Sequence, residues 1–140
     1  MGWDGCHLWA FVINGQEFGE TPGGWSDMIS PSRIGLSQVV EQGIKEFRYD
    51  YDFGDDWQHA ILIEKVLEPD PKQSYPRCVK GSRACPPEDC GGPWGYPHFL
   101  EAIQNPGHQE HEEMLEWIGG EFDPEKFDLE AVNRRLGANH

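Results

Sequence analysis

Three cysteines lie close together in a stretch that is otherwise rich in proline and glycine. Cys78, Cys85 and Cys90 are separated by six and four residues. Three thiolates and one further ligand form the donor set of a tetrahedral zinc site, and an ion would also order so long a loop. The expected fourth ligand is His59, and the alternatives are His98, Cys6 and His7. The competing interpretations are three partly buried thiols without a metal and a disulfide, which is rare in the cytoplasm.

A second group of side chains suited to chemistry surrounds a glycine in the middle of the chain. It consists of Asp52, Asp55, Asp56 and His59. Carboxylates beside an imidazole bind divalent cations or act as general acids and bases, so this group predicts a metal-dependent hydrolase or nuclease. Aspartate and glycine are also ordinary turn residues, and the alternative is a structural turn.

Two hairpins must position these groups. Aromatic and polar residues alternate from Phe47 to Phe53, which is the period of a half-buried strand, and a second strand is expected over residues 57–67 after a turn at residues 54–56. The segment His7–Phe18 contains the turn signal Asn14-Gly15 and predicts another hairpin. A loop follows over residues 68–97 and is longer than ordinary connections.

Helices are expected mainly in the last third of the chain. Apolar spacing indicates them at residues 98–104 and 108–118, after a short one within residues 34–44, and Asp128 is placed to cap a last helix. His111 is expected at the border of the core. The predicted fold is a single α+β domain over residues 1–140, with a small antiparallel sheet of hairpins packed against C-terminal helices.

Composition restricts the classes of function. The 25 acidic residues outnumber the 11 basic ones, and the net charge of −14 disfavours direct binding to nucleic acid. No apolar run approaches the roughly 20 residues that cross a bilayer, and we expect a cytoplasmic protein. Six tryptophans in 140 residues require a core or a binding surface to cover them. The candidate surface residues are Trp57, Trp94 and Tyr96.

Four stretches together resemble the plasmid ORF-3-like family, first named from an open reading frame on an agrobacterial Ri plasmid. They are MGWDGCHL from Met1, YDYDFGDDWQH from Tyr49, ACPPEDCGGPWGY from Ala84 and EWIGGEFDPEKFD from Glu116. The resemblance covers nearly the whole chain and implies an α+β domain without an established activity. Some members carry a resolvase label because they accompany insertion elements. That label fits poorly here, because the chain lacks the serine–arginine pattern and the DNA-binding helices that a resolvase needs.

The resemblance also implies two departures from the family pattern. Similar members have histidine where this chain has Trp9, and members extend several tens of residues upstream with a strand and a helix. We therefore expect a chain truncated at its N-terminus relative to the family, whose sheet exposes apolar surface that favours aggregation or partner capture.

Taken together, these patterns predict a non-enzymatic binding or adaptor module with a structural zinc ion and an unidentified protein partner. The alternatives are a metal-dependent hydrolase or nuclease and an accessory protein of mobile-element processes that meets DNA through a basic partner.

Overall fold

The computed structural model describes residues 2–21, 23 and 27–138 as two compact units. One unit contains residues 4–66 and 91–93 and holds the sheet. The other contains residues 1–3, 67–90 and 94–140 and holds most of the helical residues. Among the described residues, no helix is long and apolar enough to cross a membrane.

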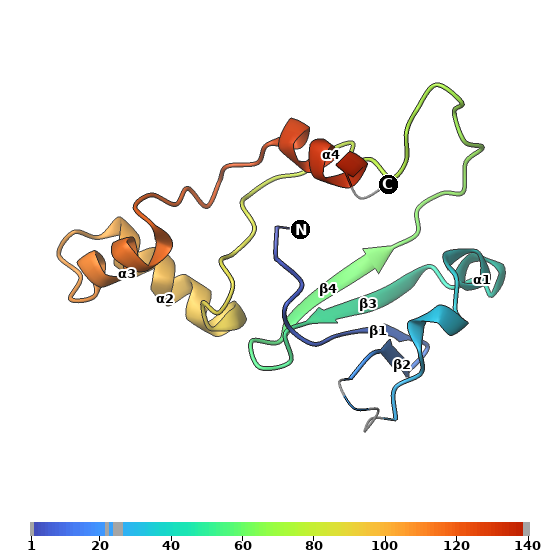
Figure 1. Cartoon of the computed structure of the whole chain (residues 1–140), viewed down its shortest axis with the longest axis horizontal. Coiled ribbons are helices and arrows are strands. Elements are labelled where there is room, and N and C mark those ends of the chain that lie inside the picture. The colour runs from blue at the N-terminus through green and yellow to red at the C-terminus, as the bar shows by residue number, and fades with distance from the viewer. Residues whose placement is uncertain (1, 22, 24–26, 139–140) are drawn as a thin grey trace. The chain divides into compact units, whose positions relative to one another are not determined.

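The sheet unit is built from the two predicted hairpins. Strands β1 (Trp9–Ile13) and β2 (Gln16–Gly19) form the first, and β3 (Glu46–Tyr51) and β4 (Trp57–Leu62) form the second. All pairs are antiparallel in the order β2-β1-β3-β4, so β3 is an inner strand (Figure 1). Asn14 and Gly15 have φ values of 49° and 77°, as a tight two-residue hairpin turn requires.

One face of the sheet carries the apolar side chains that the alternation predicted. At one end, Ile13 and Phe18 pack with Ile44 and with Val39 of helix α1 (Leu36–Glu41), and this is the buried cluster of the unit. Farther along the same face, aromatic rings follow one another with centroids 4.9 to 6.3 Å apart: Trp9, Phe11, Phe47, Tyr49 and His59. Burial raises the pKa of Tyr49 in this row.

The second strand of the β3–β4 hairpin is shorter than the sequence predicts. It ends at Leu62 instead of Leu67, because its partner β3 begins at Glu46 and the last ladder bond runs from Ile63 N–H to the Lys45 carbonyl (2.8 Å). Beyond that point no ladder partner follows on β3, so the chain leaves the sheet. The turn also begins earlier than expected, at Asp52, whose φ is 56°.

The described part of the helical unit has three helices. They are α2 (Gly92–Gln104), whose first two residues belong to the sheet unit, α3 (His111–Ile118) and α4 (Leu129–Ala138). The buried residues Phe99, Ala102 and Ile103 lie on α2, and Phe99 contacts Trp117 of α3 and Phe122 with ring centroids 5.6 and 5.5 Å away. Asp128 Oδ1 accepts from Ala131 N–H (2.8 Å), which confirms the predicted cap of α4.

Helix α2 begins six residues earlier than the sequence predicts. Pro93 and Pro97 favoured a loop before His98, but the first turn of a helix tolerates proline because its N–H groups have no intrahelical partner. The structure keeps Pro97 inside the helix, one turn farther on.

Gly92 should be the most sensitive glycine of the sheet unit. Its φ is +67°, and a Cβ atom would lie 1.9 Å from the Asp55 carbonyl oxygen. We expect Gly92→Ala to lower the free energy of unfolding by about 3 kcal/mol, from left-handed strain and overlap together. Gly43→Ala is the matched control, with φ +73° and open space, and should cost only about 1–2 kcal/mol. Equal losses in urea titrations followed by circular dichroism would contradict the close approach.

Candidate functional site

The turn between β3 and β4 is organised by one buried carboxylate. Asp52 is 8% exposed, and its Oδ1 accepts from the N–H groups of Gly54 (3.1 Å) and Asp55 (3.2 Å). Its carbonyl oxygen accepts from Asp56 N–H (2.6 Å), and its own N–H donates to the Leu8 carbonyl (2.8 Å). Aspartate tolerates the left-handed backbone required here and bonds to amides two and three residues on. Asp52 therefore closes the hairpin.

The other two aspartates of the turn also accept hydrogen bonds. Asp55 Oδ2 accepts from Gly91 N–H (3.1 Å), which ties the turn to the residue before α2, 36 positions away in the sequence. Asp56 accepts from the side-chain amide of Gln58 (3.1 Å). The predicted carboxylate cluster is therefore engaged within the sheet unit, mostly with backbone groups.

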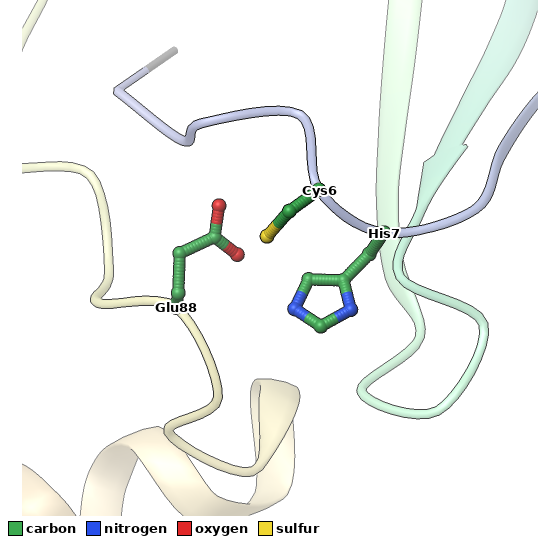
Figure 2. Close-up of side chains that lie close together, drawn as sticks. All are labelled: Cys6, His7 and Glu88. Atoms are coloured by element: carbon green, nitrogen blue, oxygen red, sulfur yellow. The ribbon is translucent and has the colours of Figure 1, made fainter.

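A histidine that the sequence suggested only as an alternative zinc ligand lies beside Asp52. His7 Nε2 is 3.7 Å from Asp52 Oδ2, and the His7 ring meets the Tyr51 ring edge to face at 6.0 Å. Figure 2 shows His7 next to Cys6 on the segment that enters β1; Glu88, also drawn there, belongs to the helical unit. His7 places an imidazole beside a buried carboxylate within the sheet unit. The pairing of β1 with β3 brings His7 close to Asp52, and no local spacing in the sequence predicts this.

His59, predicted both as a zinc ligand and as a general base, lies on β4 opposite Tyr49. Its Nδ1 is 2.9 Å from the Tyr49 carbonyl oxygen. Because a carbonyl only accepts, Nδ1 carries the proton, and in the neutral ring the lone pair lies on Nε2. The ring also packs against the Tyr49 ring with centroids 5.5 Å apart. These contacts orient the imidazole on the aromatic face.

The three loop cysteines belong to the helical unit, are half-buried and carry free thiols. Their sulfur atoms do not all lie within 4.8 Å of one another among the residues that the structure describes. The Cys78 thiol donates to the Lys80 carbonyl (3.3 Å). Burial raises the pKa of the Cys85 thiol, against the opposing effect of the Gly2 and Trp3 backbone.

Protein hydrogen bonds hold this loop in place. Asn133 of α4 contacts Cys78 twice, accepting from its N–H (2.8 Å) and donating to its carbonyl (3.0 Å). Trp3 Nε1 donates to the Pro86 carbonyl (2.8 Å), and Ala84 N–H donates to the Pro124 carbonyl (2.9 Å). These hydrogen bonds are therefore a second explanation for an ordered loop, beside the zinc ion that the sequence predicts.

The three predicted surface aromatics have different environments. Trp94, in the first turn of α2, is 91% exposed. Tyr96 stacks on Phe99 (6.3 Å) and meets Phe122 edge to face (6.3 Å), so its ring belongs to the apolar packing of the helical unit. Trp57 is half-buried at the start of β4.

One further cluster was not predicted as such. His98, His108 and Glu110 each place a ligand atom within 4.8 Å of the other two, all in the helical unit. The sequence suggests His98 only as an alternative ligand for the cysteine site. His111 instead directs Nδ1 to the Ala102 carbonyl (2.8 Å) at the border of the core, as expected. In the sequence, the only sign of this cluster was that three ligating residues lie close to the short connection between two predicted helices.

A four-stranded antiparallel sheet with separate helices makes this an α+β protein. The chain belongs to the family of plasmid pRiA4b ORF-3-like proteins, whose model matches residues 1–131. The uncharacterised protein y4hQ of Sinorhizobium fredii is 40% identical in an alignment of 139 positions, which covers 97% of this chain and 71% of that protein. The crystal structure of MM3350, a protein of unknown function from Methanosarcina mazei Go1, is similar with a TM-score of 0.83 and 37% identity, over 94% of this chain and 76% of the other.

The stability of the protein should depend more on the Oδ1 acceptor of Asp52 than on the negative charge of its side chain. Asp52→Ala removes the acceptor for two amides and places alanine at φ 56°, so we expect a loss of about 2–3 kcal/mol in the free energy of unfolding. Asp52→Asn keeps Oδ1 and the left-handed preference and should lose less than about 1 kcal/mol. Urea titration measures both, and an asparagine variant as unstable as the alanine variant would show that the charge is required.

Cys85 should react more slowly than Cys6. Cys6 is exposed, whereas burial raises the pKa of Cys85, so less thiolate forms there at about pH 8. Because the unfolded chain loses this proton first, stability should also fall as the pH rises through the ordinary thiol range. Timed alkylation with iodoacetamide and peptide mass spectrometry measure the rates, with urea-unfolded protein as the control.

Two other outcomes of this alkylation are informative. Equal rates at Cys6 and Cys85 in the folded protein would contradict the burial. Joint protection of Cys78, Cys85 and Cys90 that a chelator removes would instead support the zinc site that the sequence predicts.

Proposed function

We propose that this chain is a non-enzymatic binding module that recognises a basic segment of a protein partner, with Trp94 as the anchor of its binding surface. The observation that carries this proposal is the 91% exposure of the Trp94 side chain. Tryptophan is among the residues most enriched at the energetic centres of interfaces, because one rigid ring buries a large area on binding.

The surroundings of Trp94 support a binding role. Pro93 and Pro97 of the same helix are exposed too, and Pro97 lies three residues after Trp94, so the indole and this proline share a face of α2. Proline rings lose little conformational freedom on binding, which reduces the entropic cost of covering them. Trp94 and Pro97 together offer an apolar surface of the helical unit that a partner can cover.

The charge of the chain supports a basic partner. With 25 acidic and 11 basic residues, the chain attracts positively charged segments and repels phosphate backbones. Such steering mainly accelerates association and weakens as salt rises. We therefore assign the specificity to the Trp94 surface and the encounter rate to the acidic charge.

The hairpin turn supports a module without its own catalysis. The carboxylate of Asp52 bonds to the amides of its turn, and that of Asp55 bonds to Gly91 N–H. Side chains that hold a backbone in this way act as a scaffold. A hydrolase or nuclease centred on the turn would need these oxygens for a cation, a water molecule or a substrate.

A photoreactive amino acid at position 94 should crosslink one protein in host cells, whereas the same group at exposed Val79 should not. The captured partner is then purified and titrated calorimetrically. We expect Trp94→Ala to weaken binding by about 30-fold or more and Val79→Ala to leave it nearly unchanged.

Two results would contradict this proposal. Equal affinity of the Trp94→Ala variant and the unaltered protein would remove Trp94 as the anchor. Turnover of a phosphodiester or ester substrate that Asp55→Asn or His59→Ala abolishes in a folded protein would show an enzyme.

A further inference from the structure

The cluster of His98, His108 and Glu110 lies where α2 and α3 meet within the helical unit. His98 is on α2, and the other two residues belong to the connection that leads into α3. His98 Nε2 is 2.6 Å from Glu110 Oε2, and the two imidazole rings have centroids 5.3 Å apart at 73°. Nitrogen and oxygen donors from three residues thus converge on one small volume.

Backbone hydrogen bonds fix the connection that carries two of these donors. His108 N–H donates to the Asn105 carbonyl (2.9 Å), and His111 N–H donates to the His108 carbonyl (3.1 Å). The Asn105 side chain accepts from Gly107 N–H (3.0 Å). The Glu110 carbonyl accepts from Met114 N–H (2.9 Å) as the first bond of α3. His108 and Glu110 are therefore held by ordered backbone, which lowers the entropic cost of gathering ligands around an ion.

Solvent reaches the cluster. The side chains of His98 and Glu110 are 56% and 39% exposed. An ion can therefore enter without opening the helical unit, and water can complete its coordination. The net charge of −14 raises the local concentration of cations around the chain.

We propose that His98, His108 and Glu110 form a binding site for one Zn²⁺ ion. Two imidazoles and one carboxylate are a donor set that zinc accepts at three protein positions with water at the fourth. Calcium and magnesium prefer oxygen donors alone, so the two imidazoles select a transition metal. This site uses none of the three loop cysteines and neither Trp94 nor Pro97.

Zinc must compete with two hydrogen bonds at this site. Tetrahedral ligands about 2.0–2.1 Å from zinc lie about 3.3 Å apart, so His98 Nε2 and Glu110 Oε2 must separate from their 2.6 Å contact. His108 Nδ1 accepts from Glu110 N–H (3.1 Å), and ligation through either ring nitrogen removes that bond. Zinc should therefore bind more weakly here than in a closed structural site.

The test uses the whole chain, freed of metal by chelator and titrated with Zn²⁺ by calorimetry. We expect one site whose affinity falls at least about 10-fold in His98→Gln, in His108→Gln and in Glu110→Gln. Glu112→Gln on α3 is the matched control and should keep the affinity. Circular dichroism of each variant shows whether the fold is retained. Nitrogen NMR of the imidazoles should show zinc-dependent shifts at His98 and His108 in the unaltered protein, so the test does not depend on the variants alone.

Cobalt distinguishes this site from the cysteines. Co²⁺ bound to imidazole and carboxylate gives visible bands alone, whereas thiolate ligands add an intense ultraviolet charge-transfer band. One equivalent of Co²⁺ without that band, displaced by Zn²⁺, supports the proposal. Absence of Zn²⁺ binding, affinity unchanged in all three substitutions, or binding that Cys85→Ser abolishes while His98→Gln does not, would each overturn it.

Discussion

The sheet depends most on the hydrogen bonds that the Asp52 carboxylate accepts from the amides of Gly54 and Asp55. They close the turn of the hairpin whose first strand, β3, pairs with both β1 and β4. Turn amides that point away from a ladder need another acceptor, and a short carboxylate supplies it where the backbone is left-handed. Asp55 accepts a hydrogen bond from Gly91 N–H in the same way, so one acidic turn holds both the hairpin and the residue that precedes α2.

This role changes the interpretation of the most conspicuous acidic motif. Clustered carboxylates beside a histidine suggest a catalytic centre when only their types are known. In the folded chain each bonds to a defined partner, and His59 is oriented by the Tyr49 carbonyl. The interpretation of the loop cysteines changes in the same way, because hydrogen bonds with Asn133 hold the backbone of Cys78. Metal ligation is then best sought at His98, His108 and Glu110, whose donors already converge.

Much of the fold could be predicted because its signals are local. Alternation located β3, the Asn14-Gly15 turn located the first hairpin, and Asp128 marked the start of α4. The boundaries were less predictable where a distant partner decides them. Strand β4 ends where β3 offers no further ladder partner. Helix α2 starts before Pro97 because its first turn tolerates Pro93, and the helix then continues through Pro97.

The sequence by itself determined the α+β class, the two hairpins, the acidic charge, the family and which residue types are available for chemistry. Only the tertiary structure decided which of them meet. Asp55 and Gly91 are 36 positions apart, and His98 and Glu110 are 12 apart across a turn. Periodicity reports which face of one element is apolar, but it carries no information on where two elements cross. Such pairs form only when chain closure and packing bring their elements together.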